Sequence, residues 1–228
     1  MTQETTPTDR RTGGIRSVLS MPWAFRAYQR VVGARAFKRS VIRDRLRPQP
    51  GDRVLDIGCG PADVLEDLPD VEYVGLDLSE RYIRNARARF GDRGSFVVAG
   101  VLDVDARALG KFDLVHAHGL LHHVDDTVAA RACALAAEVL VPSGRFVTVD
   151  PCFDPDQSRL ARFTVSRDRG QAVRTPDEYR ALAAPSFARV DVVVEHSPLH
   201  IPHTATVLDC TAPKGQLTRI VQSVVVEF

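Results

Sequence analysis

The residues best suited to chemistry lie in residues 54–63, VLDIGCGPAD, between an apolar run and a helical stretch. Gly58 and Gly60 let the backbone turn sharply and approach a ligand without a Cβ in the way, beside the free N–H groups of a helix start. Asp77 lies 19 residues after Gly58, where an acid can accept hydrogen bonds from both hydroxyls of a ribose. The spacing therefore predicts a nucleoside-binding site built from Asp56, Gly58, Cys59, Gly60 and Asp77.

A second chemical cluster consists of four histidines in one short segment, His116, His118, His122 and His123. Histidine exchanges protons near neutral pH. His118 and His122 are the candidate catalytic bases, because they follow a predicted strand and ligands collect at the carboxyl edge of a parallel sheet. A structural role is favoured over a base role, since paired histidines are more often structural than catalytic. A metal site is not expected, since the spacing of His122, Asp125 and Asp126 matches no specific ligand pattern.

Four segments resemble the class I S-adenosylmethionine-dependent methyltransferases of the small-molecule type: DIGCG (56–60), GLDLS (75–79), FDLVHAHGLLHHVDD (112–126) and LVPSGRFVTVD (140–150). The resemblance covers residues 50–212 and implies S-adenosyl-L-methionine as the cofactor. It implies that the loop at 56–60 holds the methionine part, that Asp77 holds the ribose, and that residues 116–123 face the methyl group. The other predicted cofactor contacts are Leu78, Leu102, Asp103, His118 and Tyr28.

The sequence departs from the family pattern at two positions. The usual third glycine of the loop is Ala62, a small residue that still allows close helix packing. The acid that commonly follows the third strand would fall at Val101, so that Asp103 comes two residues late. We therefore expect a backbone N–H near Leu102 to take part in adenine recognition.

A dinucleotide-dependent oxidoreductase is the competing interpretation, because it also combines a glycine loop with a following acid. Asp56 argues against it, since a carboxylate two residues before the first glycine would repel a pyrophosphate. The same carboxylate suits the sulfonium and ammonium groups of S-adenosylmethionine.

The elements that must position these residues alternate along the chain. Apolar runs predict strands at 53–57, 71–76, 96–99, 111–117, 144–150, 187–194 and 204–211, and amphipathic runs predict helices at 62–68, 79–90, 126–140 and after Pro176. Alternating strands and helices favour a parallel sheet, and the last two strands are close enough to pair antiparallel. The predicted fold is α/β, a Rossmann-like seven-stranded, mostly parallel sheet with one antiparallel strand, helices on both faces and an N-terminal helical extension.

Four regions are predicted along the chain. They are a disordered tail at 1–14, an N-terminal helical lid at 15–47, a cofactor-binding domain at 48–212 with an irregular polar insertion at 151–175, and an apolar C-terminal tail at 213–228. Residues 10–47 contain eleven Lys and Arg and one Asp, a net charge of +10, within a chain of net charge +1. We expect this basic segment to dock on its own acidic domain; the alternative is that its arginines face an anionic acceptor, a membrane surface or RNA.

Composition narrows the class of protein. The chain is 44% hydrophobic and 26% charged, has no apolar run long enough for a membrane span and begins without a secretory h-region, so a soluble cytoplasmic protein is expected. The cysteines are widely spaced and are expected to be reduced thiols: Cys59, Cys133, Cys152 and Cys210.

The predicted activity is methyl transfer to a small-molecule acceptor, with O-, N- and C-methylation all open. The chain is expected to act as a monomer or homodimer, without a nucleic-acid partner and without a metal. The first alternative is a protein that binds S-adenosylmethionine without turnover, since a binding loop shows binding only. The second, nucleic-acid methylation, is less favoured because no Asn-Pro-Pro-aromatic motif follows the fourth predicted strand.

Overall fold

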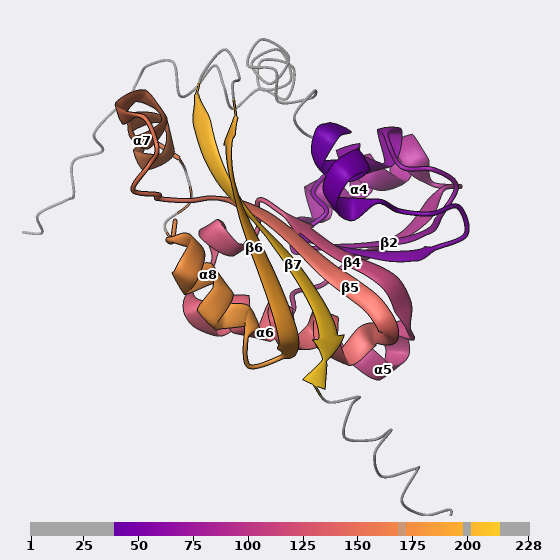
Figure 1. Ribbon diagram of the computed structural model, residues 1–228. Helices are drawn as coiled ribbons and strands as arrows, with labels where there is room; N and C mark the ends of the chain where they lie inside the picture. Colours follow the sequence, from indigo (N-terminus) through magenta and orange to yellow (C-terminus); the bar gives the residue numbers. More distant parts are fainter. Residues whose placement is uncertain (1–38, 169, 171, 198–201, 215–228) are drawn as a thin grey trace, which may run out of the picture.

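A computed structural model describes residues 39–168, 170, 172–197 and 202–214 (Figure 1). Most of the predicted lid, including Tyr28, and the tail after Lys214 lie outside the described residues. The strands are β1 (Arg53–Ile57), β2 (Glu72–Asp77), β3 (Gly94–Val98), β4 (Phe112–His118), β5 (Leu140–Pro151), β6 (Phe187–Ser197) and β7 (His203–Pro213). The helical elements are η1 (Ile42–Leu46), η2 (Asp63–Glu66), α4 (Glu80–Phe90), α5 (Ala106–Leu109), η3 (Leu121–His123), α6 (Asp126–Val139), α7 (Arg159–Ser166) and α8 (Pro176–Ala183).

All seven strands form one sheet in the order β3-β2-β1-β4-β5-β7-β6. Neighbouring strands from β3 to β5 are parallel, whereas β7 is antiparallel to both β5 and β6. The predicted Rossmann-like sheet with one reversed strand is thus confirmed. The chain order reverses between the adjacent strands β1 and β4, and in such sheets ligands bind outside the carboxyl ends of the strands at this switch point.

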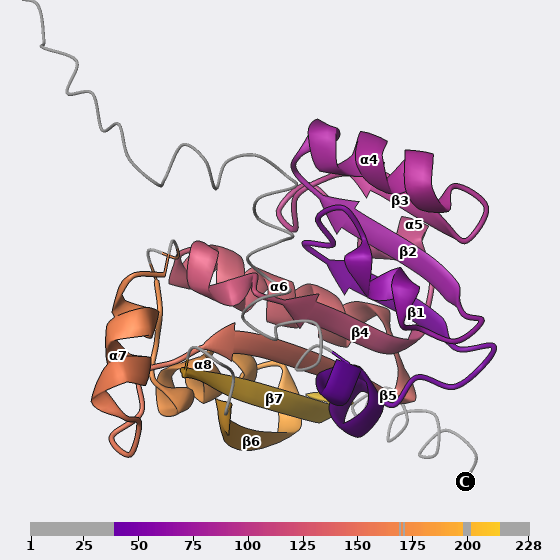
Figure 2. The same cartoon turned by 90° about the horizontal axis from the view of Figure 1, so that it is seen from above.

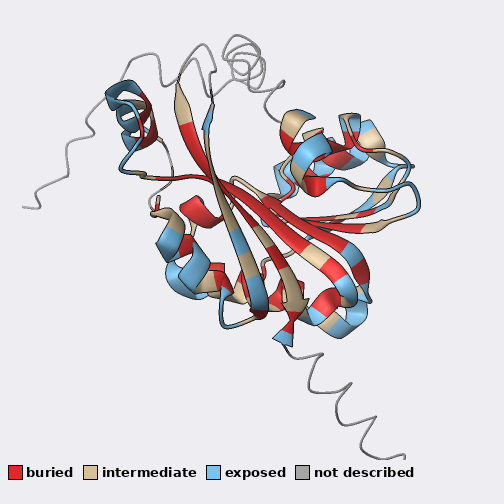
Figure 3. Ribbon diagram, viewed as in Figure 1, coloured by how far each residue is buried: buried red, intermediate tan, exposed pale blue. Residues whose placement is uncertain are grey.

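Helices cover both faces of the sheet (Figure 2). Each face has its own apolar core. Side chains alternate along a strand, so Leu55 packs in the core beneath α6 and α8, while Val54 packs in the core beneath η1, η2 and α4. Burial follows this pattern, with buried strands in the middle and exposed outer helix surfaces (Figure 3). No helix within the described part of the chain is long and apolar enough to cross a bilayer.

The helices begin where the capping residues place them. Ser79 accepts a hydrogen bond from the Tyr82 amide at the start of α4, and the Asp125 carboxylate caps α6 in the same way. At α8, Thr175 and Glu178 form a capping box with a proline in the first turn. These caps satisfy amide groups that the first helical turn leaves without partners.

Two predicted elements differ in the structure. The helix predicted at 62–68 is only the short 3₁₀ turn η2, which starts from Ala62 in the left-handed region (φ +55°) and ends before Pro69. The insertion predicted to be irregular contains the helix α7, which Ser158 caps and which buries Ala161 and Val165 at a spacing of four. Both differences reflect tertiary packing, which decides the state of segments too short to be stable alone.

The four cysteines are buried and form no disulfide, as predicted. Burial raises the pKa of the Cys133 and Cys152 thiols to about 12, so both stay protonated near neutral pH. We therefore assign them to the core and not to chemistry.

Candidate active site

The loop after β1 contains the two glycines that the sequence singles out. Gly58 (φ +77°) and Gly60 (φ +55°) both have left-handed backbones. A Cβ at Gly58 would lie 2.9 Å from Leu120 Cδ1 in the loop after β4, whereas a Cβ at Gly60 would meet nothing within 4 Å. Gly58 thus lets two loops approach each other, and Gly60 leaves open space at the carboxyl edge of the sheet.

Asp77 joins this loop to the end of β2. Its Oδ2 accepts a hydrogen bond from the Gly60 amide at 2.9 Å, and its Oδ1 accepts one from the Ser79 amide at 2.7 Å. An ionised carboxylate has about four acceptor positions, so the half-buried Asp77 keeps acceptor capacity for ligand hydroxyls.

Asp56 lies deeper than the loop that follows it. The side chain is 3% exposed, Tyr73 donates its hydroxyl proton to Oδ2 at 2.6 Å, and His116 Nδ1 lies 3.2 Å from Oδ1. Burial together with the Asp56 charge raises the pKa of Tyr73 well above its usual value. Asp56 contributes a buried negative charge beneath the loop, and its direct contact with a cofactor stays a prediction.

Cys59 also turns inward. It is 8% exposed, and a Cβ at Gly75 of β2 would lie 2.8 Å from its Sγ. Any contact of Cys59 with a ligand would therefore use its backbone.

Exposed apolar side chains stand beside this loop. Leu78 is 75% exposed and Leu102 is 61% exposed, at the carboxyl ends of β2 and β3. A Cβ at Gly100 would lie 3.0 Å from Leu78 Cδ2 and 3.2 Å from Asp103 Oδ2, so Leu78 and Asp103 flank the same glycine. Val101, at the usual position of the acid, is instead buried in the core.

These residues fit an adenosine-containing cofactor. Leu78 and Leu102 offer apolar surface for a flat base, Asp103 and Asp77 offer acceptors, and the open space at Gly60 lets a ligand approach the backbone. The sequence named each of these residues.

The histidine segment forms a buried charged cluster on the other side of the switch point. His122, in η3, is 5% exposed, and its Nδ1 lies 2.8 Å from Asp150 Oδ1 at the end of β5. The His122 amide donates to the same oxygen at 3.2 Å. Its Nε2 lies 3.2 Å from Oδ1 of Asp168, which follows α7. One imidazole therefore sits between two carboxylates.

This arrangement shifts the protonation of its members. Burial lowers the pKa of His122, but the two carboxylates more than offset burial and raise it to about 9. Burial raises the pKa of Asp168, but the hydrogen bonds from His122 and from the Gly170 amide lower it to about 2. Burial, followed by the charge of His122, lowers the pKa of the neighbouring His123.

Arg174 fixes the chain that carries Asp168 over η3. The guanidinium is 7% exposed and donates hydrogen bonds to the carbonyl oxygens of Leu121 (2.7 Å) and Val124 (2.9 Å) and to the carboxylate of Asp126 (2.6 Å). The Ala172 amide donates to the His122 carbonyl oxygen at 3.0 Å. The last part of the insertion, from Asp168 to Arg174, is thus tied to the histidine segment.

His118, the other candidate base, is half-buried at the end of β4, and its ring centroid lies 6.1 Å from that of His116. Its catalytic role and its contact with the cofactor stay predictions. Asp125 and Asp126 are occupied by the α6 cap and by Arg174, respectively.

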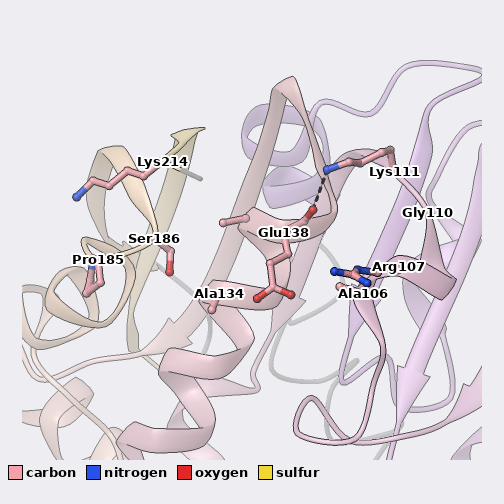
Figure 4. A pocket seen from close by; sticks show the side chains of 10 residues that line it. Ala106, Arg107, Gly110, Lys111, Ala134, Glu138, Pro185, Ser186 and Lys214 are labelled. Atoms are coloured by element: carbon pink, nitrogen blue, oxygen red, sulfur yellow. Dashed lines mark hydrogen bonds between the residues drawn. The ribbon is translucent and has the colours of Figure 1, made fainter. Parts of the chain in front are cut away.

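A cavity of about 730 Å³ lies at the opposite, amino edge of the sheet, between α5, α6 and the start of β6 (Figure 4). Its lysines serve the helix ends: Lys111 Nζ donates to the Glu138 carbonyl oxygen at 2.8 Å, and Lys214 Nζ donates to the Ala184 carbonyl oxygen at 2.7 Å. We do not place the reaction there, because the glycine loop, Asp77 and His122 lie at the other edge.

Sequence reasoning missed Asp150, Asp168 and Arg174 as parts of the site. Asp150 had a usable signal, since it ends a predicted strand while His118 directly follows another, and parallel strands end at one edge. Asp168 and Arg174 lie in the insertion, and their spacing from His122 carries no signal.

Comparison with known proteins agrees with this geometry. Residues 54–144 match the family described as "Methyltransferase domain". The chain is 35% identical over 146 residues to 27-O-demethylrifamycin SV methyltransferase of Amycolatopsis mediterranei, covering 58% of this chain and 52% of that protein. It is 33% identical over 106 residues to a ubiquinone biosynthesis O-methyltransferase of Thiobacillus denitrificans, covering 44% and 45%. The chain spans about half the length of such curated relatives.

Solved structures share the fold. The pyocyanin biosynthetic protein PhzM superposes with a TM-score of 0.66 at 20% identity, over 89% of this chain and 63% of that one. The N-methyltransferase NodS of Bradyrhizobium japonicum, solved with S-adenosylhomocysteine, gives a TM-score of 0.62 at 17% identity over 79% and 87%. These two structures show the fold, and the family match, together with the glycine loop, Asp77 and the strand order, identifies residues 54–144 as a methyltransferase domain of the class I S-adenosylmethionine-dependent type.

Proposed function

We propose that the protein is an enzyme that transfers the methyl group of S-adenosylmethionine to an oxygen of a small-molecule acceptor. The choice of oxygen is supported by relatives named as O-methyltransferases of small molecules, such as those of rifamycin and ubiquinone biosynthesis. It is also supported by the acid–base pair His122–Asp150, because a hydroxyl acceptor must lose a proton during transfer.

The cofactor side of the site would work by positioning. Asp77 would accept hydrogen bonds from the ribose hydroxyls, while Leu78 and Leu102 would enclose the adenine. The buried charge of Asp56 would favour the cationic methionine part. When bound, S-adenosylmethionine supplies an electrophilic methyl group.

The acceptor side would use His122 as a base. Asp150 accepts the Nδ1–H bond, which leaves Nε2 as the atom that can take a proton, and the same contact stabilises the imidazolium that results. Holding the acceptor oxygen near Nε2 would also orient it toward the methyl group, and such alignment contributes several kcal/mol to a reaction of this kind.

The observation that carries the proposal is that the cofactor loop and the His122–Asp150 pair occupy one edge of the sheet on adjacent strands. Gly58 of the cofactor loop lies close to Leu120, directly before η3, since a Cβ at Gly58 would lie 2.9 Å from Leu120 Cδ1. The two halves of a transfer site thus lie next to each other.

Incubation with isotopically methyl-labelled S-adenosylmethionine and a panel of phenols, alcohols, carboxylic acids and amines tests the proposal. We expect label in an oxygen-linked methyl group, and a loss of kcat of roughly 10²- to 10⁴-fold in His122→Gln. His196→Gln, an exposed histidine of β6, is the matched control and should keep full activity. Label on nitrogen or carbon would overturn the assignment to oxygen. Tight cofactor binding without label on any compound would favour a binding protein.

A further inference from the structure

Asp168 is paired with Nε2 of His122, the nitrogen that the proposed reaction needs as its base. A base must present the Nε2 lone pair to the acceptor hydroxyl, but Nε2 lies 3.2 Å from Asp168 Oδ1. An ionised carboxylate accepts hydrogen bonds only, so this contact favours a proton on Nε2. With Asp150 beside Nδ1 as well, the two carboxylates favour a proton on each ring nitrogen, which is the imidazolium form of His122.

The segment that carries Asp168 is held closely against the ring. The Gly170 amide donates to Asp168 Oδ1 at 2.7 Å and fixes the orientation of the carboxylate. A Cβ at Gly170 would lie 2.2 Å from His122 Cδ2 and 2.6 Å from the His122 carbonyl oxygen, so only glycine fits against the ring at this position.

The charged groups around His122 come from every element packed against it. Asp150 lies on β5, Asp168 follows α7, His123 shares η3, Arg174 reaches the Leu121 carbonyl, and His203 begins β7. Burial lowers the pKa of His203, and burial together with the His122 charge lowers that of His123, which favours neutral rings for both. Asp150 Oδ2 is buried and has no hydrogen-bond partner among the described residues. The charges of Asp150 and Asp168 therefore act mainly on His122.

We propose that Asp168 is a positioning residue for methyl transfer: its carboxylate holds His122 in the doubly protonated form until an acceptor hydroxyl replaces it at Nε2. On this proposal, which rests on the proposed function, displacement of Asp168 lets the imidazolium release its Nε2 proton to solvent. The neutral Nε2 then takes the acceptor proton as the O–CH₃ bond forms and the S–CH₃ bond breaks. Asp168 thereby keeps the base inactive in the absence of acceptor.

The first test uses Asp168→Asn and needs neither acceptor nor cofactor. NMR titration of the chain labelled at its 7 histidines, with His122 assigned by loss of its signal in His122→Gln, measures the His122 pKa directly. We expect the pKa to fall by at least about one unit in Asp168→Asn, since one of the two stabilising charges is gone. Asp156→Asn removes an exposed acid from the same insertion and should leave the pKa unchanged. An unchanged His122 pKa in Asp168→Asn would overturn the proposal even if methyl transfer is established.

The second test uses the pH dependence of turnover, which a merely structural residue would not shift selectively. The acidic limb of kcat/KM reports the free enzyme and that of kcat reports the acceptor complex. In Asp168→Asn we expect the kcat/KM limb to move to lower pH by the amount found by NMR, giving a roughly tenfold gain near neutral pH for a shift of one unit. The kcat limb should stay in place, because the acceptor has already displaced Asp168. Equal movement of both limbs would contradict displacement.

A second variant covers the case in which Asp168→Asn does not fold. Gly170→Ala should push the segment off the ring and lower the His122 pKa in the same direction. One ligand atom each of His122, His123 and Asp168 lie within 4.8 Å of one another, so a divalent cation is the competing occupant. Binding of zinc or nickel by the wild-type chain and its loss in Asp168→Asn would replace the proposal with a metal site.

Discussion

Asp77 has one structural and one predicted cofactor-binding role, and a single substitution would affect both. It bridges the Gly60 and Ser79 amides, and it is predicted to hold the cofactor ribose. Asp77→Ala should weaken S-adenosylhomocysteine binding by about 1.5 to 3 kcal/mol, roughly 10- to 150-fold, because hydrogen bonds to a charged group are lost. Titration calorimetry measures this loss.

Two further variants separate these tasks. Asp77→Asn keeps the size and one acceptor oxygen, so its affinity should lie between those of Asp77→Ala and the wild type. Asp92→Ala removes an exposed acid from the turn before β3 and should bind normally. If Asp77→Ala binds as tightly as Asp92→Ala, Asp77 does not contact the cofactor.

Individual site residues were predictable to the extent that they follow predicted strands. Asp77 and His122 could be named because each comes after an apolar run whose carboxyl end must lie at the ligand edge. Asp168 could not, since its place beside His122 depends on how α7 and Arg174 fold the insertion back over η3. Asp56 was identified, but its contacts with Tyr73 and His116 depend on the register of three strands.

At the scale of elements, a comparison of Gly60 in the glycine loop with Gly51 before β1 distinguishes the cost of backbone strain from the effect on ligand approach. Gly60 and Gly51 both have left-handed backbones, at φ +55° and +88°, and a Cβ at either would meet nothing within 4 Å. Alanine at either position should lower the free energy of unfolding by about 1 to 2 kcal/mol, the cost of that conformation for a residue with a Cβ. Only Gly60→Ala should also weaken cofactor binding, because only Gly60 faces the site.

Urea unfolding and calorimetry on the same two variants check this prediction, with Gly51→Ala as the matched control. Equal cofactor affinity in both variants would mean that the ligand does not approach the backbone at Gly60. A loss of affinity in Gly51→Ala would mean that strain alone disturbs the site.

The elements themselves were predictable where periodicity and caps agree. β1 coincides with an apolar run, and α4 starts directly after its serine cap. The predicted bounds of both elements agree with the structure to within a residue or two. α7 was missed because its buried face consists of only two residues, Ala161 and Val165, among polar neighbours. Its stability comes from packing against β7, which a pattern along the sequence does not contain.

At the scale of the whole molecule, the described end of the basic segment, residues 39–47, forms ion pairs with acidic residues. Arg39 contacts Asp67 at 2.7 Å, Arg45 contacts Glu195 at 2.8 Å and Arg47 lies 3.9 Å from Asp209. These acids belong to the sheet domain, so this part of the segment faces its own domain. Exposed ion pairs contribute little energy, and the apolar side chains of the same stretch must account for most of the attachment.

Two truncations separate that attachment from the predicted lid. Val41, Ile42 and Leu46 are at most 6% exposed, and burying such side chains contributes about 1.5 to 3 kcal/mol each, so deleting residues 1–47 should remove roughly 5 kcal/mol or more of stability. Deleting only residues 1–38 keeps all three and should leave the urea midpoint nearly unchanged, while S-adenosylhomocysteine affinity falls because the lid is gone. Full affinity after the shorter deletion would reject the lid. Full stability after the longer deletion would show that η1 contributes little to the core. The two deletions therefore assign stability and cofactor cover to separate parts of one segment.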